Sequence, residues 1–309
     1  PIGEKVPLTA ALKQTAISLP ALFTPILLIG GIVCGWFTPT ESAAFACMYA
    51  LVIGIFFYKS IKISRLPHIL IETMKLMTIS KQQIMKRMTF TGMETFNQIL
   101  SEGQSIGVYL GHIGNWEWIT SMPYWAPNSL CCQLYHPLEN EYFDRLFKFV
   151  RERQGAYCIP MQESLRKIIQ FTHEGKPLVV GYISDQVPLW WNIHHWVDFL
   201  HHDTPVLTGA ERIVKHTGQA FFYGHVTRVK RGHYNCEMRL ISRNTKEMAD
   251  FQITDLYYKE LEKSIRNQPE LYLWSHNRWK RTREEFNKNW EVKNGKVVKR
   301  KKEQPQPQG

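Results

Sequence analysis

His112 and Glu117, five residues apart, are the residues of this sequence best placed to do chemistry. They follow a short apolar run, Ile106–Leu110, which predicts a buried strand bounded by glycines. An imidazole next to a carboxylate can take up a proton, because the acid orients the ring and offsets the charge that it gains. The sequence therefore predicts a general base at the end of this strand, with Glu117 as its acidic partner.

The spacing alone carries little weight. With 12 histidines and 27 acidic residues in 309, about one such pair is expected by chance, and two occur. The other pair, His136 and Glu141, lies in the polar segment YHPLENE, and no strand leads into it. The context therefore favours His112 and Glu117.

The composition indicates an acidic partner. The formal net charge is +11 and the pI is near 9.3, and residues 280–309 alone contain ten Lys or Arg against four Glu. Such a run is most simply solvated and attracted to anionic lipid. No recognition motif for nucleic acid accompanies the charge, so we expect membrane lipid and not nucleic acid as a partner.

No metal site is expected from the Cys and His pattern. The six cysteines form no C-x-x-C pair, which indicates free thiols in a reducing compartment. His194, His195, His201 and His202 are adjacent in pairs, and such pairs cannot easily share one tetrahedral metal. Alternating with tryptophans, they predict instead an exposed aromatic loop at a membrane interface.

Two uncharged apolar runs occupy the N-terminal part, residues 14–40 and 43–58. Their lengths are near what a bilayer demands, so we expect about two membrane spans; buried helices of a soluble protein are the alternative. Lys59, Lys62 and Arg65 follow the second run, which places the rest of the chain in the cytoplasm. Because the first residue is Pro, we expect a piece of a longer reading frame.

Strands and helices alternate in the middle of the chain, which predicts an α/β domain. Polar residues follow two of the strands, His112 after the first and Asp185 after a second buried strand, Leu178–Ile183. In open α/β sheets the site lies outside such strand ends, so we expect His112, Glu117 and Asp185 around one crevice. The other expected elements are helices at 81–100 (broken at Gly92), 140–153, 162–173, 209–216 and 253–266, a hairpin at 221–229 and 234–241, and a disordered tail at 284–309.

Several arginines could hold phosphate groups, for which the planar guanidinium is well suited, although for any single one a solvated helix face is the simpler interpretation. Backbone donors in the turn at Gly114 and Asn115 could stabilise an oxyanion. The arginines nearest the predicted site are Arg145, Arg151, Arg153, Arg166 and Arg212.

Residues 1–72 resemble the C-terminal part of the large membrane subunit of TRAP-type dicarboxylate transporters. The resemblance rests on GGIVCGWFTPTESAA, the apolar helix after it and the basic exit KSIKISRLPHIL. In such transporters this motif lies in the substrate and ion region. Only about two spans are present here, which cannot form an alternating-access pathway, so transport by this chain alone is not expected.

From about residue 70 to 283 the chain resembles the bacterial lipid A biosynthesis acyltransferases of the lysophospholipid acyltransferase superfamily. Five blocks match in order: YLGHIGNWEW, the helix ending RERQG, PLVVGYISDQVP, TPVLTGAER and PELYLWSHNRWKR. The resemblance implies a glycerolipid-acyltransferase-like domain, residues 73–283, with a central, mostly parallel sheet flanked by helices. At the junction, LPHILIETMKL, it implies a chimeric gene or an assembly artefact.

The same resemblance implies the roles of the site residues. His112 would be the general base, Glu117 its acidic partner, and Asn115, Asp185 and Arg212 further substrate-binding residues, while either Arg151 or Arg153 matches the family's arginine. The acyl donor would be a thioester on acyl carrier protein, the acceptor a lipid A precursor, and no cofactor or metal is implied. The catalytic domain would lie on the cytoplasmic face of the bacterial inner membrane.

Two alternatives stay open. A glycerolipid acyltransferase would use the same base with a smaller acceptor such as a lysophospholipid. A non-catalytic transporter remnant would insert into the membrane and transfer no acyl group.

Overall fold

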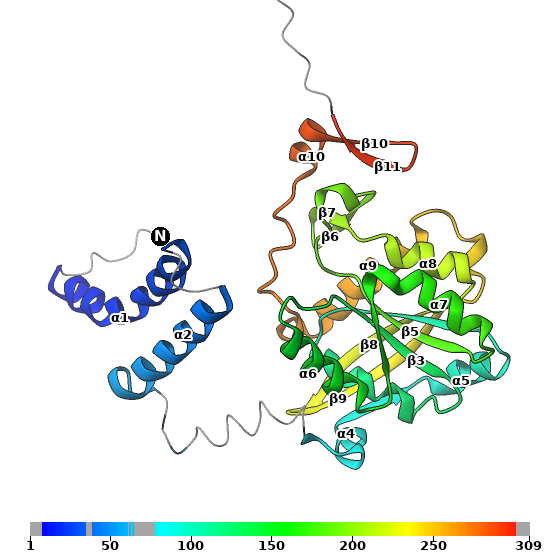
Figure 1. Ribbon diagram of the computed structural model, residues 1–309, viewed down its shortest axis with the longest axis horizontal. Coiled ribbons are helices and arrows are strands. Elements are labelled where there is room, and N and C mark those ends of the chain that lie inside the picture. Colours follow the sequence, from blue (N-terminus) through cyan, green and yellow to red (C-terminus); the bar gives the residue numbers. More distant parts are fainter. Residues whose placement is uncertain (1–7, 35–38, 61, 63, 65–77, 301–309) are drawn as a thin grey trace, which may run out of the picture. The chain divides into compact units, whose positions relative to one another are not determined.

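The computed structural model describes residues 8–34, 39–60, 62, 64 and 78–300, and the chain divides into two compact units, residues 1–78 and 79–309 (Figure 1). The sequence placed this boundary at residue 72, and the junction segment 66–76 lies outside the described residues. So do Arg65 and residues 35–38 of the transporter-like motif.

The first unit contains two helices that pack against each other, α1 (Leu8–Val33) and α2 (Pro39–Val52), the second continued by the π-helical turn η1 (Ile53–Phe57). The Tyr49 hydroxyl donates to the Pro20 carbonyl at 2.9 Å, and the Tyr58 hydroxyl donates to the Ile17 carbonyl at 2.7 Å. The two uncharged runs are thus helical over residues 14–33, 39–40 and 43–57. Within the described part of the chain, none of the helices combines the length and the hydropathy of a membrane span.

In the described part of the second unit, seven strands form a sheet in the order β1-β9-β8-β2-β5-β3-β4 (Figure 1). Neighbouring strands run parallel except β8 and β9, which form the predicted hairpin, so the expected mostly parallel sheet is confirmed. Every residue of β2 is buried, as expected for a central parallel strand covered on both faces. The bounds are β1 Met88–Thr91, β2 Ile106–Leu110, β3 Leu130–Tyr135, β4 Tyr157–Pro160, β5 Leu178–Ile183, β8 Ala220–Lys230 and β9 His233–Ser242.

Helical segments cover both faces of this sheet. The chain leaves β2 through the 3-10 segment η3 and leaves β3 through α6, then returns through α7 and α8 to β5 and β8. Right-handed crossovers place the outgoing and the returning segments on opposite faces, because the direction of travel across the sheet reverses at β4. The bounds are α4 Lys81–Arg87, α5 Met93–Ser101, η3 Trp116–Tyr124, α6 Glu141–Glu152, α7 Ser164–His173, α8 Gly209–Thr217 and α9 Gln252–Asn267.

The expected helix at 81–100 is two helices with an edge strand between them. A capping box at Ser80 and Gln83 starts α4, and β1 then pairs with β9 before Gly92 starts α5. The φ angle of Gly92 is +74°, and a β-carbon there would lie 2.4 Å from the Met238 carbonyl oxygen. The break at Gly92 was therefore predicted correctly, but the strand before it was not.

The segment predicted as an exposed loop of histidines and tryptophans is folded, although Trp191, His201 and His202 are exposed as expected. The segment is an antiparallel hairpin, β6 (His195–Phe199) and β7 (His202–Val206). Its side chains pack within the unit: Phe199 is buried, and the His195 ring stacks on Phe251 and bonds Asp255 at 2.7 Å. In the described part of the chain, no group of three or more His, Cys, Asp or Glu is placed to hold a metal ion.

The predicted disorder of residues 284–309 is corrected for the part that the structure describes. This part contains α10 (Arg283–Asn289) and a hairpin of β10 (Trp290–Lys293) and β11 (Lys296–Lys299). Asn294 and Gly295 both have positive φ, the conformation that an Asn-Gly hairpin turn requires. The Asn-Gly dipeptide is a hairpin signal, but the high charge of the tail favoured a prediction of disorder.

Candidate active site

His112 lies two residues beyond the end of the central strand, where the backbone is tightly fixed. The His112 carbonyl accepts from the Leu273 amide at 3.0 Å, and the Gly114 amide donates to the Leu271 carbonyl at 2.9 Å. A β-carbon on Gly111 would lie 2.3 Å from Cδ1 of Leu261, so a larger residue here would force the Leu261 side chain to shift. The segment 271–273 thus holds the loop that presents the imidazole.

Asp185 is the carboxylate that contacts His112. Its Oδ1 lies 2.5 Å from the imidazole Nδ1, and its Oδ2 accepts from the His112 backbone amide at 3.1 Å. Asp185 is almost fully buried. Leu110 and Ile183 are register partners in neighbouring parallel strands, so His112 and Asp185 both come two residues after a matched pair. This geometry places the two side chains together.

Arg278 supports this carboxylate from behind. Its Nη2 donates to Asp185 Oδ2 at 3.2 Å, its Nε donates to the Asp185 carbonyl at 3.0 Å, and its guanidinium lies 4.1 Å from the centre of the Tyr272 ring. Burial by itself raises the pKa of the Asp185 carboxyl, but hydrogen bonding and charge from His112 and the charge of Arg278 lower it below its usual value. Asp185 is therefore ionised at neutral pH. Arg278 was not predicted as a site residue, although it lies in the family-like block PELYLWSHNRWKR.

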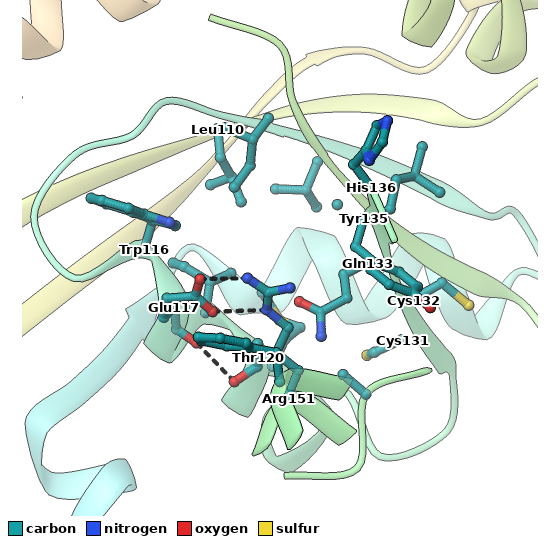
Figure 2. A pocket seen from close by; sticks show the side chains of 18 of the residues that line it. Leu110, Trp116, Glu117, Thr120, Cys131, Cys132, Gln133, Tyr135, His136 and Arg151 are labelled. Carbon is teal, nitrogen blue, oxygen red and sulfur yellow. Dashed lines mark hydrogen bonds and ion pairs between the residues drawn. The ribbon is translucent and has the colours of Figure 1, made fainter. Parts of the chain in front are cut away.

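Glu117 does not contact the imidazole in the structure, which corrects the predicted pairing. Instead its carboxylate binds Arg151 through two hydrogen bonds, from Nε at 3.1 Å and from Nη2 at 2.8 Å (Figure 2). This bidentate contact raises the pKa of Arg151. Glu117 belongs to η3 and Arg151 to α6, so the pair links the two segments that cover this face of the sheet.

The other ring nitrogen of His112 faces a cavity of about 540 Å³. The Gln186 side-chain nitrogen lies 3.5 Å from His112 Nε2, and the Trp116 ring meets the imidazole edge to face at 5.1 Å. Figure 2 shows the Glu117–Arg151 pair on one wall of this cavity and β3 on another. The rest of the lining is largely apolar and includes Val108, Leu110, Ile119, Met122, Cys131, Cys132, Leu134, Leu138, Phe147, Ala156, Met161, Val179, Ile183 and Leu273.

The thiols of this region are not nucleophiles at neutral pH. Burial raises the pKa of Cys131 and of Cys158 to about 11 and that of Cys132 to about 12. Since the thiolate is the reactive form, these cysteines remain protonated and inert. Besides these thiols, the ionisable side chains that line the cavity are those of His112, Glu117, Tyr135, His136, Asp144 and Arg151.

The structure separates the remaining predicted residues. Arg151 lines the cavity, whereas Arg153 is exposed at the end of α6. Asn115 precedes η3, and its side chain makes no capping hydrogen bond. The Gly114 amide is already bonded to Leu271, so it is not a free donor for an oxyanion and the prediction is corrected for Gly114; for the Asn115 amide it stays a prediction.

Arg212 lines a second cavity of about 540 Å³, beside Ser164, Leu165 and His216 of α7 and α8. Side chains alternate along β5, so Gly181 faces the first cavity and Tyr182 the second, on opposite faces of the sheet. Leu134, Met161 and Ile183 line both cavities, which therefore adjoin.

Comparison with known families assigns both parts of the chain. The family model described as bacterial lipid A biosynthesis acyltransferase matches residues 62–281, which is most of the chain. The model of the DctM component of the tripartite ATP-independent periplasmic transporters matches residues 3–97. Both predicted resemblances are confirmed, and the two matches overlap at the predicted junction.

The relatives found among curated proteins include several that are named as TRAP transporter proteins. The large permease protein DctM of Pseudomonas aeruginosa, a C4-dicarboxylate transporter protein, is 32% identical over 119 residues, which are 38% of this chain and 27% of that protein. The sialic acid permease protein SiaT of Haemophilus influenzae is 39% identical over 92 residues, 30% of this chain and 14% of that protein. The chain thus spans less than a third of the length of these relatives.

The match over residues 62–281 includes His112, Glu117, Arg151, Asp185 and Arg278, the residues that the sheet and its crossovers bring together. It identifies the enzyme class as an acyltransferase. The chain belongs to the family of bacterial lipid A biosynthesis acyltransferases.

Proposed function

We propose that this protein transfers a fatty acyl chain from a thioester on acyl carrier protein to a hydroxyl of a lipid A precursor. The observation that carries the proposal is the contact of His112 with Asp185 at the mouth of an apolar cavity. The cavity volume, about 540 Å³, is within the range of pockets that bind small ligands, and its lining suits an acyl chain. A basic protein surface, with a net charge of +11, suits an acidic carrier.

His112 acts as the general base through Nε2. Because Asp185 accepts a hydrogen bond from Nδ1, the ring carries its proton there and leaves the Nε2 lone pair toward the cavity. The acceptor hydroxyl gives its proton to Nε2 as its oxygen attacks the thioester carbonyl carbon. When the carbon–sulfur bond breaks, the imidazolium returns that proton to the leaving sulfur. Asp185 remains ionised throughout and stabilises the imidazolium.

Glu117 and Arg151 bind the substrate at the mouth of the cavity. The bidentate contact fixes the guanidinium of Arg151, whose side chain stays partly exposed and presents its charge to an anionic group of the acceptor. Phosphate groups on a glucosamine lipid provide such an anion. Arg212, in the adjoining cavity, and Arg153 are further candidates for contact with the acceptor.

The catalytic unit acts on the cytoplasmic face of the inner membrane in this proposal, because acyl carrier protein is the donor. The transporter-like first unit supports attachment to a membrane. A glycerolipid acceptor remains the second candidate, since the same base would serve it.

The acceptor is tested by incubating the purified full chain with acyl carrier protein thioester and either a lipid A precursor or lysophosphatidic acid. Mass spectrometry of the products should show an acyl group added to the lipid A precursor and little to lysophosphatidic acid. Transfer to lysophosphatidic acid alone would replace the proposal with a glycerolipid acyltransferase. Transfer to neither would favour the non-catalytic alternative.

A further inference from the structure

Three charged side chains of helix α6 bind groups elsewhere in the protein, while Glu141 and Arg145 are exposed. Asp144 accepts a hydrogen bond from the Leu138 amide at 2.8 Å, and Glu152 accepts one from the Cys158 amide at 3.1 Å. Arg151 binds Glu117. The helix starts at Asn140, whose side chain accepts from the Tyr142 and Phe143 amides, so its rotation is fixed from the first turn.

The opposite side of α6 is apolar and faces outward. The exposed fractions are 82% for Tyr142, 49% for Phe143, 37% for Leu146 and 64% for Phe149. At 100° per residue these four side chains occupy one continuous side of the helix, from which only Val150 is buried. We refer to Tyr142, Phe143, Leu146 and Phe149 as the α6 face. A helix of a water-surrounded domain has the reverse arrangement, with its apolar side against the core.

The α6 face continues into the active-site cavity. Phe147, one turn along from Phe143, and Leu138, just before the helix, both line the cavity, and both are more than two fifths exposed to solvent. These two apolar side chains therefore connect the outside of the helix with the cavity next to His112. A lipid that lay against this helix would have an apolar route to the site.

Basic side chains border the same face. Arg145 lies along its edge in an ion pair with Glu141, Lys148 lies further round the helix in a pair with Glu152, and Arg153 follows at the C-terminal end. Aromatic and aliphatic residues on one side with basic residues along the border are the composition of helices that lie in the interfacial plane of an anionic bilayer.

We propose that the α6 face binds the surface of an anionic lipid bilayer and that a bilayer-resident acceptor passes along it into the cavity. The first part stands on the exposed surface of α6. The second part rests on the proposed lipid acceptor.

The contact is tested in the full chain with the photo-crosslinking residue 4-benzoylphenylalanine in place of Phe149. The protein is bound to vesicles of phosphatidylcholine with phosphatidylglycerol and irradiated, and the products are identified by mass spectrometry. Adducts with lipid are expected. The same residue in place of Val229, which is 69% exposed near the C-terminal end of β8 and outside α6, is the control and should give few lipid adducts.

Other partners would give other products. Adducts with residues of α1 or α2 would show that the first unit covers the α6 face, and adducts with a second copy of the chain would show a dimer. Either result, or lipid adducts no more frequent than at Val229, would overturn the proposal. This readout needs no acyl transfer, so it remains valid if the proposed function fails.

The route is tested with the double variant Phe143→Ser and Phe149→Ser. For an acceptor embedded in vesicles the KM should rise at least about tenfold. Each phenylalanine that inserts into the bilayer contributes substantially to the binding of the protein to the vesicle. With detergent-dispersed acceptor the kinetics should change little, and Val229→Ser should change neither value. An equal loss with both forms of acceptor would point to a damaged site and contradict the proposed route.

Discussion

At the scale of single residues, the imidazole of His112 is held from three directions. Asp185 binds its Nδ1, Trp116 meets the ring edge to face, and the backbone on both sides is bonded to Asp185 or to the segment 271–273. Arg278 compensates the buried carboxylate. A base needs such support because a ring free to rotate would rarely present Nε2 to the substrate.

Asp185→Asn should lower kcat by about 10²- to 10⁴-fold, because an amide can no longer hold the proton on Nδ1 and stabilise the imidazolium. Initial rates of acyl transfer measure this effect. His173→Ala, at the exposed end of α7, is the matched control for a surface change and should keep the wild-type rate. Full activity of Asp185→Asn would show that this carboxylate does not serve the base.

The free energy of unfolding should fall in acid because Asp185 becomes protonated. The folded protein lowers the pKa of Asp185, so the folded state binds this proton less readily than the unfolded chain does. The stabilisation is complete above the ordinary aspartate value, about 3.9, and is lost as the pH falls through the lowered value. Urea unfolding between about pH 3 and pH 6 should show a steeper loss for the wild type than for Asp185→Asn. Equal slopes would contradict the ionised state assigned to Asp185.

Glu117 and Arg151 should act as a coupled pair. In a double-mutant cycle with Glu117→Gln and Arg151→Gln, the coupling energy in kcat/KM should be about 0.5–3 kcal/mol, as for residues in direct contact. Arg166→Gln is the control for loss of a surface charge, because it breaks an exposed ion pair with Glu163, three residues earlier in the chain. Additive effects of the two changes would show that the contact does not matter for the reaction.

At the scale of elements, β2 sets the position of the base. The close approach of α9 to the strand end depends on Gly111, because a β-carbon there would lie 2.3 Å from Leu261 Cδ1. The hydroxyl of Tyr257, also on α9, donates to the Leu110 carbonyl at 2.7 Å. The strand end and the helix therefore move together.

Gly111→Ala should lower the free energy of unfolding by about 1–3 kcal/mol, since the added methyl group overpacks this contact. Leu261→Ala in the same chain removes the obstructing methyl groups, so the double variant should be less destabilised than the sum of the two single changes. Urea unfolding of the four proteins measures both effects. A fully additive result would mean that the two side chains do not share this space.

Sequence patterns predicted the elements that signal themselves locally. β2 and β5 are short buried runs, and the hairpin of β8 and β9 surrounds a Lys-Arg-Gly turn, so all three were located within one or two residues. The strands β1, β3 and β4 were missed, because four to six residues of mixed polarity carry no clear period, and their pairing is decided by distant partners.

The site was predicted in part for the same reason. Polar residues after two strands placed His112 and Asp185 in one crevice, but the choice of Glu117 as the partner of His112 followed closeness in the sequence. The register between β2 and β5 sets Leu110 beside Ile183 and so makes Asp185 the partner of His112. This register is a long-range property that no local pattern shows. Arg278 lies 93 residues from Asp185 along the chain, and no local pattern joins the two.

At the scale of the whole molecule, two compact units of different ancestry share one chain. The matches to the transporter family and to the acyltransferase family overlap at residues 62–97. The boundary between the two compact units of the structure falls within this overlap, after residue 78. All the residues assigned to the reaction belong to the second unit, which has its own sheet and core.

Residues 79–309 should therefore fold without the first unit. We expect this fragment to unfold cooperatively and to keep the acyl transfer rate with detergent-dispersed acceptor. Thermal unfolding followed by circular dichroism, together with the rate assay, measures both properties. A fragment that aggregates or unfolds without a transition would show that the first unit completes the core.

The measurement closest to the central claim is the initial rate of acyl transfer from acyl carrier protein to a lipid A precursor by the full chain carrying His112→Ala. We expect a loss of about 10²- to 10⁴-fold in a protein that still unfolds cooperatively, because the proton acceptor is removed. A His112→Ala protein that transfers acyl groups at the wild-type rate, above all if His136→Ala does not, would contradict it.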